Sequence, residues 1–217
     1  VGSGPDKHDI WRIPAAGGSA TQITDGGDSF RDTEPTWSRD GQWLVFTRQD
    51  RTEDSDGDCA YDTDTNTGGC IAIVPYNGDE DDVIIIESSG TPGSPQWSPV
   101  GNKIVFNNGG NLYVADLGET INGSDADMGG TLLSDYTSSL IAPTWSPNGK
   151  LIAVQQSSSN IIHYFSATSG DLVTSTTLTS LGDDVNEVDW ARASLNNTEH
   201  ECTTYVNTDC TKFNPEI

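Results

Sequence analysis

The chain has 217 residues, a length that suits one domain, and its 33 acidic residues against ten basic ones give a formal charge of −23. A surface this negative repels phosphate backbones, so we expect no nucleic-acid binding. The longest apolar runs have only the length of a β-strand, such as residues 83–86, which predicts no membrane insertion.

The first predicted elements are two strands within residues 8–24, joined by the turn at Gly17 and Gly18. A repeat follows, with copies that begin near residues 35, 94, 142 and 185. Its clear copies are residues 35–46 (PTWSRDGQWLVF), 95–106 (PQWSPVGNKIVF) and 143–154 (PTWSPNGKLIAV), and its degenerate copy is residues 185–192 (VNEVDWAR). The tryptophans of the four copies are 60, 48 and 45 residues apart. Periods near 45 residues are typical of propeller blades.

Each copy predicts four antiparallel strands. A short strand carries the tryptophan, a glycine turn such as Asp40-Gly41 or Asn148-Gly149 reverses the chain, and an apolar strand follows. Third strands are expected at 71–74, 111–115 and 161–165, and fourth strands at 82–86, 130–133 and 173–178. The sequence therefore predicts an all-β fold, a single β-propeller domain over residues 1–217 with about four blades of four strands.

Residues 50–70 interrupt the first repeat with an acidic insertion. Four cysteines allow three pairings, and the simplest joins Cys59 to Cys70 and Cys202 to Cys210, because each pair brackets a short polar loop. Two disulfides favour an oxidising compartment. Clustered carboxylates beside a glycine suit Ca²⁺, which takes six to eight oxygen ligands. The candidate calcium ligands are Asp54, Asp56, Asp58, Asp62 and Asp64. The alternative is a solvated acidic insertion that binds no metal.

The chain opens in mid-repeat, so residues 8–24 read as the outer two strands of a blade that lacks its inner pair. Residues 185–210 offer an inner pair. We expect the two pairs to form one composite blade that closes a four-bladed ring and leaves no open edge. The alternatives are an arc of a longer ring and an open arc that a partner completes.

The loops that enter the inner strands should surround the mouth of the central channel. They are predicted to span residues 25–34, 87–94, 135–142 and 180–187. The candidate binding residues on these loops are Asp28, Phe30, Arg31, Asp32, Glu34, Asp135, Tyr136, Asp183, Asp184 and Glu187. An acidic rim with aromatic residues suits a basic peptide, a cation or a sugar. Loops of an acidic protein are acidic in any case, and this alternative stays open.

The three clear copies, together with residues 9–24, resemble the WD-like repeat of TolB-like propellers. Arg39 and Val100 depart from the pattern, which otherwise has proline and aspartate or asparagine there. The resemblance implies a non-catalytic scaffold that binds a protein or assembles with itself in a periplasmic or extracellular complex. Isolated histidines and the lack of a nucleophile motif predict that the chain is not an enzyme. Alternatives are a carbohydrate-binding propeller, or the propeller part of a polysaccharide lyase or peptidase.

Overall fold

The computed structural model describes residues 8–52, 59–62, 64, 67–121, 129–134, 136, 139–178, 189–190 and 204–205. This described part consists of β-strands and one short 3₁₀ helix, η1 (Glu80–Asp82), which confirms the predicted all-β class. No helix among the described residues has the length and apolar character that crossing a membrane requires.

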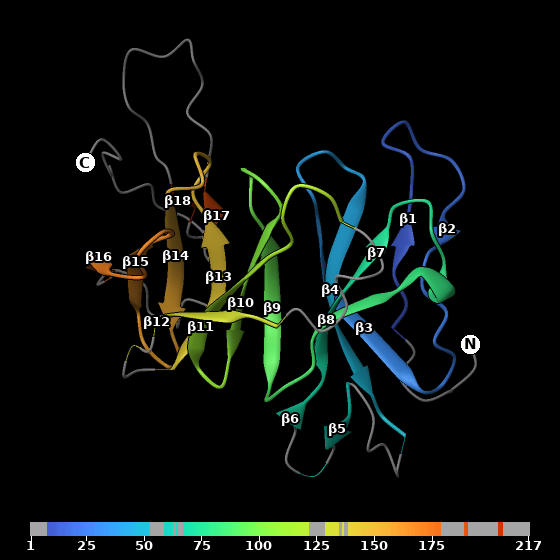
Figure 1. The fold of residues 1–217 in the computed structure, drawn as a ribbon, viewed down its shortest axis with the longest axis horizontal. Helices are drawn as coiled ribbons and strands as arrows, with labels where there is room; N and C mark the ends of the chain where they lie inside the picture. Colours follow the sequence, from blue (N-terminus) through green and yellow to red (C-terminus); the bar gives the residue numbers. More distant parts are fainter. Residues whose placement is uncertain are drawn as a thin grey trace.

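Three antiparallel sheets of four strands form the body of the molecule, and each takes its strands in sequence order from one segment of the chain (Figure 1). The first blade contains β3 (Phe30–Trp37), β4 (Trp43–Asp50), β7 (Cys70–Pro75) and β8 (Ile84–Glu87). The second blade contains β9 (Pro92–Trp97), β10 (Lys103–Asn108), β11 (Asn111–Asp116) and β12 (Thr131–Ser134). The third blade contains β13 (Leu140–Trp145), β14 (Leu151–Gln156), β15 (Ile161–Ser166) and β16 (Leu172–Thr177). The predicted third and fourth strands of all three blades are confirmed.

The middle strands of a blade are buried on both faces. In the first blade, Val45 and Phe46 of β4 and residues 71–74 of β7 have no exposed surface. Neighbouring blades pack face to face, so a middle strand meets apolar side chains on either side. These strands therefore read as continuous apolar runs rather than alternating patterns.

The serine of the repeat organises the turn between the first two strands. In the third blade, the Ser146 hydroxyl donates to the Asn148 side chain at 2.8 Å and accepts the backbone N–H of Leu151 at 2.9 Å. Ser38 and Asp40 make the same contacts in the first blade, and the hydrogen bond from Ser38 is the main cause that lowers the pKa of Asp40. In the second blade, where Val100 replaces the side-chain acceptor, the Ser98 hydroxyl donates to the Val100 carbonyl instead, so the serine is the common feature of the three turns.

The repeat tryptophans occupy equivalent places, as predicted, at the ends of β3, β9 and β13. Trp97 packs in an apolar cluster with Val45 of the preceding blade and is 6% exposed. Trp145 is 7% exposed, and its indole N–H donates to the carbonyl of Gln96 in the preceding blade at 3.0 Å. Trp37 is 51% exposed, because no inner strands precede it among the described residues.

The pairing of the first two strands contains a β-bulge in each of the three four-stranded blades, which the sequence did not predict. Glu34, Ser94 and Ala142 stand just before the repeat proline, and all three have left-handed backbone conformations, with φ of 57°, 50° and 49°. Such conformations cost non-glycine residues on the order of 1–2 kcal/mol. In the first blade the bulge directs Glu34 toward its neighbour, and its carboxylate accepts the Ser94 N–H of the second blade at 2.9 Å.

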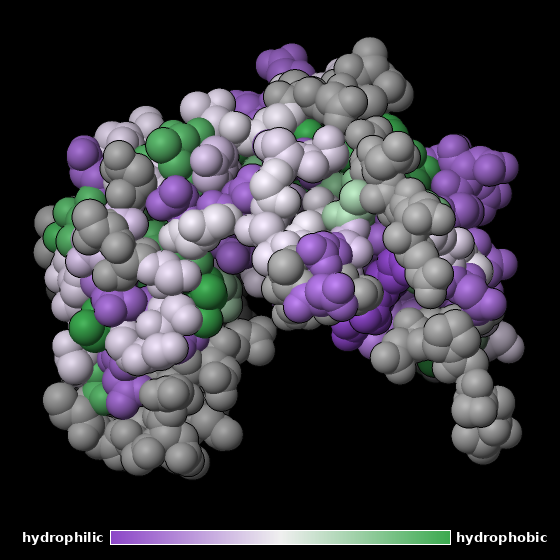
Figure 2. Space-filling model, turned by 90° about the horizontal axis from the view of Figure 1, so that it is seen from below, coloured by the Kyte–Doolittle hydropathy of each residue, from purple (hydrophilic) through white to green (hydrophobic). Residues whose placement is uncertain are grey.

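The terminal strand pairs differ from the prediction of a composite blade. Strands β1 (Trp11–Arg12) and β2 (Thr21–Gln22) form one two-stranded sheet, and β17 (Asp189–Trp190) and β18 (Thr204–Tyr205) form another. The two pairs lie at opposite ends of the molecule (Figure 1). Seen from below, the described residues form an arch with a gap between its two sides (Figure 2). Three blades turn the chain through only part of a circle, so its terminal strands do not meet.

Candidate functional site

The acidic insertion of the first blade is anchored to the sheet at both ends. Cys59 forms the predicted disulfide with Cys70, the first residue of β7, and both are buried. The Asp50 N–H donates to the carbonyl of Cys59 at 2.7 Å. The second predicted pair, Cys202 with Cys210, lies outside the described residues, as do Asp54, Asp56 and Asp58.

Within the insertion, β5 (Tyr61–Asp62) and β6 (Thr67–Gly68) form a small hairpin that projects from the first blade (Figure 1). Gly68 has φ of 105°, and a Cβ there would lie 2.2 Å from the carbonyl oxygen of Ala60. A glycine is therefore needed for the hairpin to approach the chain beside it. The Asp64 N–H donates to the Asp62 carboxylate at 2.8 Å, which turns the chain after β5.

An open groove of about 720 Å³ lies beside this hairpin. Its lining residues are Arg51, Thr52, Ala60, Tyr61, Asp62, Asp64, Thr67, Gly68, Gly90 and Thr91. The last two belong to a predicted rim loop, and the Arg51 N–H donates to Ser29 of another rim loop at 2.8 Å. The groove therefore lies on the face where the rim loops were expected, with two carboxylates and an aromatic ring in its wall.

One wall of the groove combines an arginine with an aromatic ring. The Arg51 guanidinium lies over the Tyr61 ring, 5.5 Å from its centroid. Thr52 donates to the Asp50 carboxylate through its hydroxyl at 2.9 Å and its backbone N–H at 3.0 Å. Sequence reasoning missed Arg51 and Tyr61, because the carboxylates around them dominated the composition of the insertion.

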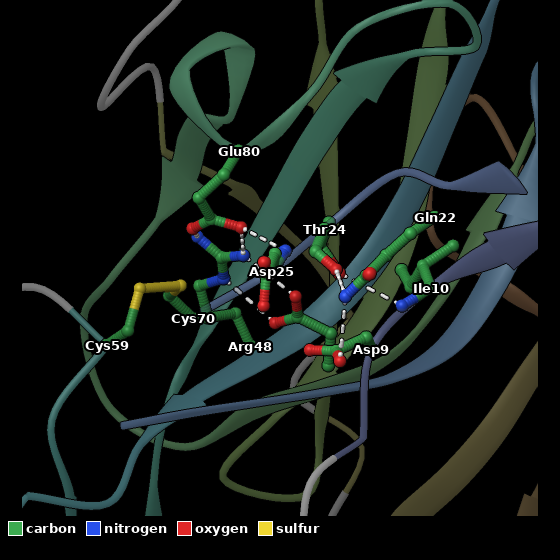
Figure 3. A network of polar contacts seen from close by, with 10 residues as sticks. Asp9, Ile10, Gln22, Thr24, Asp25, Arg48, Cys59, Cys70 and Glu80 are labelled. Atoms are coloured by element: carbon green, nitrogen blue, oxygen red, sulfur yellow. Dashed lines mark hydrogen bonds and ion pairs between the residues drawn. A yellow bond between two sulfur atoms is a disulfide. The ribbon is translucent and has the colours of Figure 1, made fainter. Parts of the chain in front are cut away.

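A buried ionic network lies next to the anchored end of the insertion (Figure 3). Arg48 donates two hydrogen bonds to the Asp32 carboxylate, at 2.8 and 2.7 Å, and two to the Glu80 carboxylate, at 2.7 and 2.9 Å. Its guanidinium also lies 4.6 Å from the centroid of the Phe30 ring. Burial alone would lower the pKa of Arg48, but its hydrogen bonds and charge interactions with both carboxylates raise it, so it stays charged.

The same network holds the N-terminal strand pair against the first blade. The Asp25 N–H, just after β2, donates to the Glu80 carboxylate at 3.0 Å (Figure 3). Ile10 and Ile23 flank the pair and pack into an apolar cluster with Phe46 of β4. The Arg48 network is therefore a structural device that fixes one end of the arc.

The structure separates the predicted rim residues of the first blade. Asp28 is exposed in the turn before β3, and Glu34 is exposed at the bulge. Asp32 is 4% exposed and paired with Arg48, so the expectation of an exposed rim is wrong for this residue. Phe30 stacks on the same arginine, and Arg31 donates to the His8 ring at 2.6 Å.

In the third blade, Tyr136 is half-buried, with its ring 4.6 Å from that of His163 and 5.8 Å from that of Phe165. The other predicted rim residues, Asp135, Asp183, Asp184 and Glu187, lie outside the described residues.

His163 supports a prediction about pH. It is 2% exposed, and its two ring nitrogens lie 2.7 Å from the Ser175 hydroxyl and 3.0 Å from the Gln156 side-chain oxygen. Burial lowers the pKa of His163 below its ordinary value of about 6.5. The unfolded chain then binds more protons, so this residue makes stability fall as pH drops below about 6.5. Replacing it with glutamine should remove that component from unfolding curves measured between pH 5 and 7.5. Identical pH slopes for both proteins would contradict the assignment.

Calcium binding by the insertion stays a prediction. Among the described residues, no three His, Cys, Asp or Glu side chains form a metal-binding group, while three of the five candidate ligands are not described. If the loop binds Ca²⁺, a hundredfold excess of Ca²⁺ over Kd should stabilise the folded chain by about 2.7 kcal/mol and raise its melting temperature. The paired change Asp56→Asn and Asp58→Asn should erase the rise. A melting temperature indifferent to Ca²⁺ would leave the loop as a solvated acidic insertion.

Comparisons with known proteins support the fold and go no further. No protein-family model matches the sequence, and no curated protein matches it. Among solved structures, a calcium-binding regucalcin from Agrobacterium tumefaciens superposes with a TM-score of 0.58 at 13% identity, over 85% of this chain and 58% of that one. The β-propeller domain of Cps50 (Swd1) from Myceliophteria thermophila superposes with a TM-score of 0.52 at 14% identity, over 79% of this chain and 53% of that one. An oligogalacturonate lyase in complex with manganese superposes with a TM-score of 0.55 at 15% identity, over 81% of this chain and 50% of that one.

These likenesses confirm the propeller fold. The chain spans between half and three-fifths of the length of these three neighbours. The names of the three proteins indicate different functions, so the likeness transfers no activity.

Proposed function

We propose that the chain is a non-catalytic scaffold that binds a protein ligand, of basic character, in the groove beside the anchored insertion. The observation that carries the proposal is the groove itself, in which Asp62 and Asp64 stand on a hairpin that a disulfide fixes to a rigid blade. Preorganised loops on a rigid scaffold lose little entropy when they bind.

Charge supports a basic ligand. The chain carries −23 overall, and both groove carboxylates lie on exposed residues. Such a field attracts a cationic partner over a distance and speeds its association. The resemblance to TolB-like repeats adds the expectation of a scaffold in an envelope or extracellular complex. The Cys59–Cys70 disulfide is consistent with an oxidising compartment, and we propose a periplasmic or extracellular location.

A carbohydrate ligand is the second candidate, favoured by Tyr61 and three threonines in the groove wall. Aromatic rings and hydroxyl groups bind sugars by stacking and hydrogen bonding. The affinity for an uncharged sugar would be nearly independent of salt concentration, whereas the affinity for a basic peptide would fall as salt screens the charges.

Fluorescence anisotropy with labelled Arg- and Lys-rich peptides, alongside neutral peptides and oligosaccharides, tests the proposal. We expect the basic peptides to bind, and the paired change Asp62→Asn and Asp64→Asn to weaken them about 5- to 30-fold, since exposed charge contacts are worth about 0.5–1 kcal/mol each. The matched control, Asp81→Asn with Glu119→Gln, removes the same charge at exposed sites outside the groove.

Equal weakening by both pairs would show that only net charge matters and would overturn the assignment of the groove. Binding of oligosaccharides alone would favour the second candidate.

A further inference from the structure

The two ends of the arc carry complementary halves of a blade. Strand β17 ends in the repeat tryptophan Trp190, whose ring meets Tyr164 of the third blade at 5.8 Å. Trp145 packs on the second blade in the same manner, so β17 and β18 hold the two inner positions of a fourth blade.

The pair β1–β2 holds the outer positions of a blade that would precede the first. Strand β2 leads into the inner strand β3 just as β8 leads into β9 and β12 leads into β13. Ile10 and Ile23 pack on the first blade as an outer pair should. One end therefore lacks outer strands among the described residues, and the other end lacks inner strands.

The N-terminal end exposes the apolar surface that an inner pair would cover. Trp37 is 51% exposed, whereas the equivalent Trp97 and Trp145 are almost fully covered by a preceding blade. Trp11 on β1 is 55% exposed and Ile13 is 64% exposed. The guanidinium of Arg12 lies over the Tyr76 ring of the first blade, so the adjacent Trp11 side chain points to the opposite face, away from that blade.

We propose that a second copy of this chain completes the arc. The inner pair β17–β18 of each copy joins the outer pair β1–β2 of the other, with β18 beside β1 and Trp37 covered by the inner pair. Two copies with three blades each, plus two composite blades, give a ring of about eight, within the usual range of about four to eight. The contact is head-to-tail and closes on itself, which ends further association.

Length favours a second copy over other occupants, and charge favours a head-to-tail arrangement of the two copies. The chain covers 50–58% of three solved propellers, so two copies together have about the length of one such ring. Residues 1–51 contain six of the ten basic residues and eight acidic ones, whereas residues 179–217 contain eight acidic residues and two basic ones. Both stretches are net acidic, at −2 and −6, so their mutual repulsion is smaller in two head-to-tail contacts than in one head-to-head contact and one tail-to-tail contact.

Sedimentation velocity of the 217-residue chain between 1 and 100 μM tests the proposal, at 0.15 M and 0.5 M NaCl because salt screens the net charge. We expect a species of twice 23.2 kDa. Trp37→Ser and Trp11→Ser should each raise the dimer dissociation constant at least tenfold. The control Val100→Ser removes an apolar side chain from a turn of the second blade. Val100 is 50% exposed, about as much as the two tryptophans, and its replacement should leave the dimer dissociation constant unchanged. Circular dichroism confirms that each variant is folded.

Hydrogen exchange supplies the second measurement. Amides of Trp11–Arg12 and Thr204–Tyr205 should gain protection together as the dimer forms. A monomer at every concentration and salt, growth beyond a dimer, or a dimer that the two tryptophan changes leave intact would each overturn the proposal.

Discussion

Replacing Arg48 with methionine should lower the free energy of unfolding by about 3–5 kcal/mol. The change keeps much of the apolar stem but removes the positive charge that pairs with the Asp32 and Glu80 carboxylates, and Asp32 is almost fully buried. A buried charge that loses its partner keeps its desolvation cost without the compensating attraction. Urea denaturation at pH 7 measures the loss.

The chain offers a matched control and a rescue. Lys103 pairs with Asp116 at 2.9 Å, but both side chains are about half exposed, so Lys103→Met should cost less than about 1 kcal/mol. Adding Asp32→Asn and Glu80→Gln to Arg48→Met removes the stranded charges and should recover part of the stability. Equal losses for Arg48→Met and Lys103→Met would show that the network contributes no more than a surface ion pair.

Replacing Trp145 with alanine should cost about 3–5 kcal/mol, whereas Trp37→Ala should cost less than about 1.5 kcal/mol in dilute protein. Both tryptophans occupy the same place in the repeat, but Trp145 is wedged against the second blade and Trp37 is half exposed. Deleting a buried aromatic ring removes its transfer free energy and leaves a cavity. The measurement is again urea unfolding, at submicromolar protein.

This comparison isolates burial from residue type. Similar losses for the two changes would mean that Trp37 is covered within a single chain, in conflict with the open arc. If a second copy covers Trp37, the cost of Trp37→Ala should grow with protein concentration, because association stabilises the folded chain by mass action.

The blades were predictable because the repeat encodes them locally. A tryptophan, a serine-capped turn with Gly149 or its equivalent, and an apolar strand specify the first half of each blade without reference to the rest of the chain. The Cys59–Cys70 pairing was predictable for the same reason, since both residues bracket one short loop.

The site was less predictable, because its residues depend on contacts between distant segments. Asp32 reads as an exposed rim residue until Arg48 of the next strand and Glu80 of η1 are seen beside it. A single arginine in the apolar strand 43–50 was the available signal. Ring closure could not be predicted either, since it depends on the small angle between successive blades, which no local motif specifies.

The separation of the two ends within one chain tests the account most directly. Spin labels introduced as unnatural amino acids at Thr21 of β2 and Thr204 of β18, in chains diluted with unlabelled protein, report that separation by electron–electron resonance. Neighbouring strands of a blade lie about 5 Å apart, and only β1 would separate β18 from β2, so labels in a composite blade within one chain would give distances below about 20 Å. The open arc predicts that dilution abolishes any such short distance, because only labels on different copies come together. A short distance that persists at full dilution would show that the chain closes on itself and would contradict the account.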